Sequence, residues 1–227
     1  MTPRLSIVLP VHNQADHIAR VVQDYSSALA GLPAFELLLV ENGSRDASRA
    51  ACAALAAADP AVRLLVADRP GWGHAVRLGL AAAQGEVLAY SNSARTAPAD
   101  LRRMLDLALA GPPQVLKADR QLREGPLRRL GSALYNLEAR LLFGVRLRDV
   151  NGTPKVFPRR FAALLGLRRD DDLLDLEFCA ICRREGYPVR QVPVAAAARH
   201  GGRSTTRLGS AWRMYRGALA LRAELRA

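Results

Sequence analysis

The chain has 227 residues, of which 50% are hydrophobic and 24% charged, so it can bury the core of a compact domain and is not an intrinsically disordered chain. No apolar run reaches the roughly 18–20 residues that span a bilayer, and the start leads directly into a strand without the regions of a signal peptide, so we expect a cytoplasmic protein. The net charge of +12 favours an anionic partner, namely nucleic acid, an anionic membrane surface or a phosphorylated substrate.

Short apolar runs alternate with helical patterns through the first half of the chain. Strands are predicted at 5–10, 35–40, 62–67, 86–90 and 114–117, and helices at 16–30, 46–58, 73–83 and 98–110. Continuous apolar strands separated by helices are typical of a parallel sheet covered on both faces. Ligands of such sheets bind at the carboxyl ends of the strands, in the loops that follow them.

The second half is less regular. Helices are predicted at 127–143, 173–185 and 210–225, and strands at 154–157 and 188–194. No linker, repeat or low-complexity tract interrupts the chain. We therefore predict one domain, with residues 1–205 as its body and 206–227 as a basic C-terminal helix of the same domain.

Four loops follow the first four predicted strands, at 10–13, 41–46, 68–75 and 91–98, and each carries polar or glycine residues. Taken singly, each has an ordinary structural interpretation: Asn-Gly-Ser is turn chemistry, and Ser44 or Asp46 is a helix cap. Because the carboxyl ends of parallel strands meet at one edge, all four loops are expected to line one crevice.

The same loops carry a specific resemblance. SIVLPVHNQADHI, LLLVENGSRDAS and PGWGHAVRLGL are similar, in order, to the opening motifs of the inverting family 2 glycosyltransferases. RDVNGTPKVFPRR, LDLEFCAICRREGYPVRQVPV and RHGGRS resemble the later motifs of the dolichyl-phosphate-mannose-synthase-like branch. The similarity covers about residues 4 to 205. It implies an α/β protein with the GT-A fold, which is Rossmann-like, with a mainly parallel central sheet and helices on both faces.

The resemblance also implies a bound nucleotide-diphosphate sugar, with UDP favoured over GDP. Carboxylates in such loops accept hydrogen bonds from a base N–H or ribose hydroxyls. By motif position, the residues that bind the nucleotide sugar are Pro10, Val11, His12, Asn13, Glu41, Asn42, Asp68, Gly71, Gly73, Ser91 and Ser93.

One motif departs from the family pattern. After the fourth strand the family carries an Asp-x-Asp or single Asp that holds a divalent cation, whereas this chain has Ser91-Asn92-Ser93. Hydroxyls and an amide are poor ligands for a hard cation, so Mg²⁺ or Mn²⁺ is disfavoured as a cofactor. Arginine pairs with phosphate without a metal. The candidate phosphate-binding residues are Arg95, Lys117, Arg120, Arg199 and Arg203.

The Asp-x-Glu segment supplies candidate catalytic carboxylates. A hydroxyl or amine acceptor needs a base, whereas a phosphate acceptor does not. Asp175 is the first choice for that base, Asp172 the second, and Glu177 the third. Asp175 and Glu177 point about 200° apart on a helix, so only one of them can face the crevice.

Two further features have alternative interpretations. In the C-terminal helix, Leu208, Trp212, Tyr215 and Leu219 form a stripe that suits either packing against the domain or peripheral contact with an anionic membrane. Cys179 and Cys182 form a C-x-x-C pair that we interpret as buried small residues rather than a redox or metal site.

The sequence therefore predicts a glycosyltransferase that transfers a sugar with inversion from a nucleotide-diphosphate sugar to an unidentified acceptor, without a firm requirement for metal. One alternative is a catalytically silent nucleotide-sugar-binding protein of the same fold. Another is a polyprenyl-phosphate glycosyltransferase at the membrane surface. No recognisable nucleic-acid-binding module is present, and we expect no nucleic acid partner.

Overall fold

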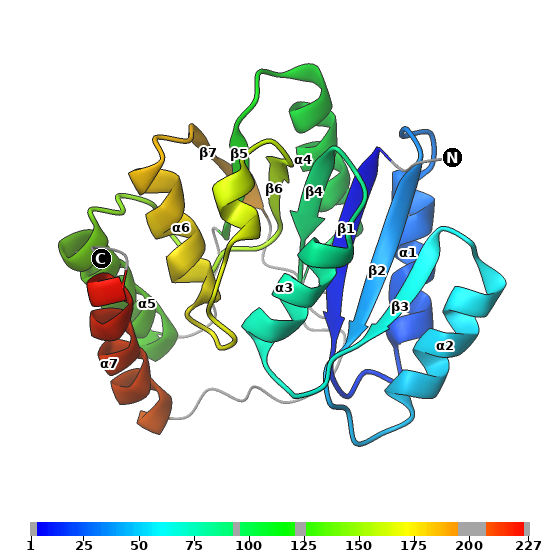
Figure 1. Ribbon diagram of the computed structural model, residues 1–227, viewed down its shortest axis with the longest axis horizontal. Coiled ribbons are helices and arrows are strands. Elements are labelled where there is room, and N and C mark those ends of the chain that lie inside the picture. Colours follow the sequence, from blue (N-terminus) through cyan, green and yellow to red (C-terminus); the bar gives the residue numbers. More distant parts are fainter. Residues whose placement is uncertain (1–3, 93–95, 121–125, 195–207, 225–227) are drawn as a thin grey trace.

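The computed structural model describes residues 4–92, 96–120, 126–194 and 208–224, together with all their side chains except those of 126–132 and 208–215. In this part of the chain one seven-stranded sheet has the order β3-β2-β1-β4-β6-β5-β7 (Figure 1). The strands are β1 (Leu5–Val11), β2 (Phe35–Glu41), β3 (Val62–Val66), β4 (Val87–Tyr90), β5 (Val115–Arg120), β6 (Lys155–Pro158) and β7 (Val189–Val194). β6 is antiparallel to β4 and β5, and the other paired strands are parallel.

Helices cover both faces of this sheet. They are α1 (Ile18–Leu29), α2 (Ser48–Ala58), α3 (Trp72–Ala82), α4 (Pro98–Ala110), α5 (Pro126–Phe143), α6 (Leu174–Arg184) and α7 (Leu208–Glu224), with a short 3-10 helix η1 (Ala162–Leu165). Proline at the start of α4 is suited to the first helical turn, where its missing N–H costs no hydrogen bond. The α/β class and the mainly parallel sheet agree with the sequence prediction.

The two faces are filled by alternate residues of the strands, because successive strand side chains point in opposite directions. Ile7 and Leu9 of β1 pack in a core cluster with residues of α1, α2 and α4. Val8 packs in a second cluster with residues of α3, α5, α6 and α7. Since the central strands are buried on both sides, they read in the sequence as continuous apolar runs rather than alternating ones.

The direction of β6 was not predicted. Its register pairs Tyr90 with Lys155 and Lys117 with Lys155, so β6 begins beside the carboxyl end of β4 and runs back along it. A four-residue strand has too short a pattern to reveal its direction, which is set by the long connection through α5. η1 was also missed, as a single turn gives no periodic signal.

α6 is surrounded by the rest of the domain, and Leu174–Cys182 are all buried. Cys179 and Cys182 are free thiols within it, as interpreted from the sequence. α7 packs beside α5 (Figure 1), and its Ala218 and Leu221 are buried in the same core cluster as α6. A Cβ on Gly217 would lie 2.3 Å from the Leu173 side chain, so glycine permits this close approach. Of the C-terminal stripe, Leu219 is half-exposed, and the side chains of Leu208, Trp212 and Tyr215 lie outside the described part.

Candidate functional site

The loops after β1 and β2 are joined by hydrogen bonds at the carboxyl edge of the sheet. Asn13 has a positive φ of 50°, its N–H donates to Ser44 Oγ at 3.0 Å, and its Oδ1 accepts from the Arg45 N–H at 2.8 Å. His12 Nδ1 lies 2.8 Å from the Asn42 carbonyl. The polar motif residues therefore fix the shape of the two loops as well as lining the edge.

Glu41 and Asn42, which were predicted to bind the nucleotide sugar, are both buried. Glu41 Oε1 accepts the Ser44 N–H at 2.5 Å. Asn42 Oδ1 accepts the Gly71 N–H at 2.8 Å and so joins the β2–α2 loop to the β3–α3 loop. Amide chemistry suits this position, because an amide oxygen satisfies a backbone donor without placing a second negative charge beside Glu41.

The β3–α3 loop carries a network of charged groups. His74 Nε2 lies 2.6 Å from Asp68 Oδ1, and Arg69 bridges Asp68 and Asp170 at 3.2 and 2.8 Å. Arg77 contacts Asp170 as well. The hydrogen bond with His74 and the charge of Arg69 lower the pKa of the exposed Asp68 carboxyl. Asp68 therefore stays anionic and available to a ligand at the strand ends.

Gly71 and Gly73 have a packing role that the sequence analysis did not identify. A Cβ on Gly73 would lie 2.3 Å from the Arg169 carbonyl oxygen, and one on Gly71 would lie 2.6 Å from that of Asp170. The Asp170 carbonyl also accepts the His74 N–H at 3.0 Å. The glycines let the start of α3 lie directly against the segment 168–172, so packing alone is a sufficient reason for glycine at both positions.

The segment 168–172 is held on its other side by Glu177. The Glu177 carboxylate is buried and accepts the backbone N–H groups of Arg168 and Arg169 at 2.9 to 3.0 Å. Asp171 Oδ1 accepts the Leu173 N–H at 3.0 Å and caps the turn before α6. Glu177 is thus committed to the backbone of this segment and positions it.

Asp175 lies in a buried polar cluster. Its Oδ1 accepts a hydrogen bond from Tyr90 Oη at 2.8 Å and forms an ion pair with Lys155 Nζ. Lys155 Nζ also lies 5.2 and 5.6 Å from the ring centroids of Tyr90 and Phe178. As expected from their spacing on the helix, Asp175 and Glu177 have different surroundings. The Asp175 carboxylate, however, contacts the buried Lys155 amine and does not face the crevice. A carboxylate held this way is a poor general base.

Asp172, the second choice, is exposed just before α6. Protein atoms crowd its carboxyl enough that desolvation raises its pKa, and the negative charges of Asp171 and Asp175 add to the increase. A raised pKa makes a carboxylate a stronger base. Among the three carboxylates singled out by sequence, Asp172 has the accessibility that proton transfer requires.

The first residue after β4 is engaged within the protein. Ser91 is fully buried, and its hydroxyl donates to Thr96 Oγ1 at 2.7 Å. Within the described ranges no group of three or more His, Cys, Asp or Glu side chains is arranged to hold a metal. The hydroxyl and amide donors present are a poor set for Mg²⁺ or Mn²⁺. Ser93 and Arg95 lie outside the described residues.

Two candidate phosphate ligands are engaged within the protein. Lys117 was expected to face phosphate, but it is fully buried, and its Nζ donates to the carbonyls of Ala118 and Arg148 at 2.9 and 2.7 Å. Arg120, at the end of β5, donates to both Asp149 oxygens at 2.7 Å. Arg199 and Arg203 lie outside the described residues.

The sequence analysis missed the group of Tyr90, Lys155 and Asp175. A signal was available, because Lys117 and Lys155 are the only lysines in a chain with 33 basic residues. Every other basic residue of the chain is arginine, so the two lysines mark positions where a different cation is required. Both lysines are fully buried and occupy paired positions on β5 and β6.

Comparison with known proteins agrees with this architecture. A family model described as Glycosyl transferase family 2 matches residues 6–171. The chain is 26% identical to the undecaprenyl-phosphate 4-deoxy-4-formamido-L-arabinose transferase of Pseudomonas fluorescens, over 88% of this chain and 59% of that protein. It is 27% identical to the polyprenol monophosphomannose synthase of Mycolicibacterium smegmatis, over 88% of this chain and 80% of that protein. The chain spans 32 to 59% of the first three curated relatives.

Solved structures share the fold. Glucosyl-3-phosphoglycerate synthase from Mycobacterium tuberculosis, in complex with Mn²⁺, UDP and glucosyl-3-phosphoglycerate, superimposes with a TM-score of 0.76 at 23% identity. That match covers 97% of this chain and 80% of the synthase. The complex of the same enzyme with UDP gives a TM-score of 0.74 at 22% identity, over 98% of this chain and 79% of the synthase.

Proposed function

Because the chain belongs to glycosyl transferase family 2, we propose that it transfers a sugar from a nucleoside-diphosphate sugar to an acceptor with inversion at the anomeric carbon. The observation that carries this proposal is the joining of the loops at one edge of the sheet. Asn13, Asn42 and Gly71 tie three successive loops together at the strand ends. A preformed edge of this kind suits a ligand long enough to cross several strands.

The donor is a uridine diphosphate sugar in this proposal. The exposed His12 and the anionic Asp68 flank the place where a base and ribose contact the β1 and β3 loops. A carboxylate there accepts the N–H of uracil or the hydroxyls of ribose. The glucosyl-3-phosphoglycerate synthase with the same fold was solved with UDP bound, which supports uridine over guanosine.

Asp172 is the proposed general base for a hydroxyl or amine acceptor. It precedes α6 at the end of the segment 168–172, which packs on the start of α3 through Gly73 and is anchored by Glu177. Glu177 is a positioning residue in this scheme, and Asp175 supports the helix from within. Inversion requires one displacement at the anomeric carbon, with the acceptor proton leaving to the base as the bond to diphosphate breaks.

Arginine is proposed to balance the charge of the leaving diphosphate. Ser91 is buried, and residues 91–97 between β4 and α4 contain no Asp or Glu, so a cation at that place would lack an anionic ligand from this loop. A guanidinium donates two parallel hydrogen bonds to a phosphate, and this binding needs no metal. Arg199 and Arg203 of the RHGGRS segment are the residues proposed for this role, with Arg95 beside the altered motif.

A lipid phosphate acceptor is a second candidate, favoured by one observation on α5. Leu134, Leu137 and Leu141 are 59, 50 and 70% exposed and share one face of the helix. The exposed Arg140 lies beside them, and the net charge is +12. In the described part of the chain no helix is long and apolar enough to cross a membrane. An apolar stripe with flanking arginine suits the surface of an anionic bilayer.

The test of the main proposal separates binding from turnover. UDP and GDP, each with and without a sugar, are titrated against the full chain with Mn²⁺ or EDTA present, and release of nucleoside diphosphate is followed with candidate acceptors. Asp172→Asn is expected to abolish turnover while leaving UDP affinity unchanged, and the neighbouring Asp171→Asn is the matched control. Binding of UDP without turnover by any acceptor would favour the silent binding protein, and absence of nucleotide binding would reject both.

The lipid alternative has its own test. Sedimentation with vesicles containing anionic phospholipid is compared for wild type, Leu137→Glu and Leu165→Glu. Leu165 is also exposed, at 38%, but lies in η1, away from the α5 stripe. The alternative predicts that only Leu137→Glu releases the protein from the vesicles. Equal sedimentation of all three proteins would reject it.

A further inference from the structure

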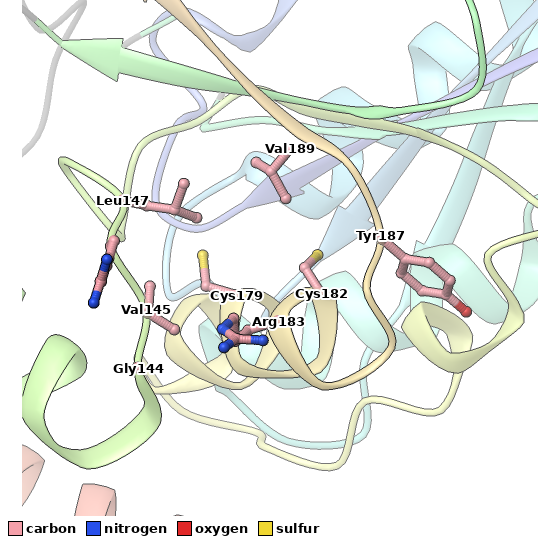
Figure 2. Close-up of a pocket in the computed structure, with 9 residues that line it drawn as sticks. Gly144, Val145, Leu147, Cys179, Cys182, Arg183, Tyr187 and Val189 are labelled. Atoms are coloured by element: carbon pink, nitrogen blue, oxygen red, sulfur yellow. The ribbon is translucent and has the colours of Figure 1, made fainter.

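A pocket lies between the end of α5, the second half of α6 and the start of β7 (Figure 2). Its volume is about 470 Å³, within the range of roughly 300–1,000 Å³ that holds small ligands. Apolar side chains and thiols form most of its lining, namely Val145, Leu147, Cys179, Cys182, Tyr187 and Val189. None of these residues was assigned to the nucleotide-sugar site.

The interior of the pocket suits an apolar group. Cys179 and Cys182 are one turn apart on α6, so both side chains lie on the same face and point into the same space (Figure 2). Burial raises the pKa of both thiols, so they remain neutral at physiological pH. Neutral thiols behave as small apolar groups, which makes this interior a place for hydrocarbon.

Two arginines complete the lining. Arg146 and Arg183 are exposed, and neither makes a hydrogen bond or ion pair with any residue in the described part of the chain. Gly144 leaves room beside Arg183, because a Cβ there would lie 3.9 Å from Arg183 Nε. By contrast, the adjacent Arg184 pairs with Glu185 at 2.8 Å. The pocket thus combines an apolar interior with two guanidinium groups that have no ionic partner among the described residues.

Val189 and Arg183 place one end of this pocket far from the carboxyl edge of the sheet. Val189 is the first residue of β7, so it lies at the opposite edge from the loops described above. Arg183 is in the last turn of α6, whereas Asp175 is in its first turn. Eight residues of helix separate them, or about 12 Å along the axis at about 1.5 Å per residue. A ligand here would not occupy the nucleotide-sugar site.

We propose that this pocket binds a small amphipathic anion, whose hydrocarbon part contacts Leu147, Cys179 and Cys182 and whose carboxylate or phosphate pairs with Arg146 and Arg183. Charge complementarity selects the anion, since a guanidinium forms charge-assisted hydrogen bonds with either group. The apolar interior selects an alkyl or prenyl body over a free inorganic ion.

The experiment titrates decanoate, decyl phosphate and uncharged decanol against the full chain by calorimetry, below the concentrations at which they form micelles. Both anions are expected to bind at least about tenfold more tightly than decanol, because decanol cannot form the charge-assisted hydrogen bonds with arginine. Inorganic phosphate is expected not to bind at the same concentrations. Preference for decanoate or decyl phosphate distinguishes a carboxylate ligand from a phosphate ligand.

Variants locate the site. Arg183→Gln is expected to weaken binding of the anions about tenfold, and Leu147→Trp to abolish it by filling the pocket. Arg184→Gln, the matched control on the same helix, is expected to bind normally. Thermal denaturation verifies that each variant is folded. If the tryptophan variant does not fold, Cys182→Ser replaces it and is expected to weaken binding by making the interior polar.

Three results would overturn the proposal: equal affinity for decanoate and decanol, equal weakening by Arg183→Gln and Arg184→Gln, or competition between UDP and decanoate. Binding of UDP is measured separately on the same samples. A failure of this proposal therefore leaves the glycosyltransferase proposal standing, and the reverse is also true.

Discussion

Lys117 offers a sharp test of the buried polar interior. Its amine is fully buried, and burial lowers its pKa from 10.5 to about 8, with a smaller contribution from the charge of Lys155. Between these two values the unfolded chain holds a proton that the folded protein has released. Unfolding then takes up a proton, so the free energy of unfolding rises as pH increases from about 8 to 10.5. At about 1.4 kcal/mol per pH unit, the gain is about 3 kcal/mol.

The variant Lys117→Met isolates this effect. The methionine does not titrate, so the difference in unfolding free energy between wild type and variant is expected to shift by about 3 kcal/mol in favour of wild type between pH 7.5 and 10.5. Titrating groups that do not interact with Lys117 cancel in the difference. Urea unfolding at several pH values supplies the free energies.

A direct titration is also accessible, because the chain has two lysines. Lysine labelled with ¹³C at Cε gives two signals, and the signal absent from Lys117→Met belongs to Lys117. Its chemical shift is expected to move with a midpoint near pH 8. A midpoint at or above 10.5, together with a stability difference that does not change with pH, would show that burial of Lys117 does not disfavour its charged form.

Three further predictions test other parts of the site. Gly73→Ala is expected to destabilise the protein by at least about 1–3 kcal/mol in urea unfolding, because its Cβ would lie 2.3 Å from a carbonyl oxygen. Gly166→Ala is the control and is expected to have little effect, because the nearest neighbour of its Cβ would lie at 3.5 Å. Asp175→Asn leaves the buried Lys155 amine without its counter-charge and is expected to lower the free energy of unfolding by about 3–5 kcal/mol. Glu86→Gln, in an exposed ion pair, is expected to lower it by less than about 1 kcal/mol, and equal losses would contradict the buried pairing. Arg199→Ala is expected to weaken UDP binding about ten- to a hundredfold by calorimetry, and unchanged affinity would remove Arg199 from the phosphate site.

The strands and helices of the first half could be predicted because each carries a strong local signal. Leu5–Val11 and Phe35–Glu41 are apolar on both faces, which a strand between two helical layers requires. Pro98 marks the first residue of α4, as expected. The carboxyl edge could also be predicted, since four loops after parallel strands must meet there. The predicted ends of elements differ from the observed ends by up to three residues, because backbone hydrogen bonding rather than composition decides where an element ends.

The roles of individual polar residues could not be predicted, because they depend on contacts between distant segments. Asp175 and Glu177 are similar in sequence, yet one faces Lys155 across 20 residues and the other holds the backbone of Arg168. Gly73 looks like part of a ligand-binding glycine motif, but the segment it touches lies about a hundred residues later. Motif position predicts a region for the site, but it does not predict the contacts of each residue within that region.

The altered motif after β4 raises the question of which group a divalent cation could use. Glu41 and Asp68, the two loop carboxylates predicted to bind the nucleotide sugar, already have partners: Glu41 accepts the Ser44 N–H, and Asp68 contacts His74 and Arg69. A metal would have to displace these donors, which lowers the net gain from coordination. We therefore expect Mn²⁺ to strengthen UDP binding by less than about tenfold, or about 1.4 kcal/mol. Calorimetric titration of UDP in Mn²⁺ and in EDTA measures this difference directly. If EDTA abolishes binding, one of the two carboxylates rearranges to hold the metal. Separate titrations of Glu41→Gln and Asp68→Asn would identify which one, because the variant that lacks the metal-binding carboxylate would bind UDP equally with Mn²⁺ and with EDTA.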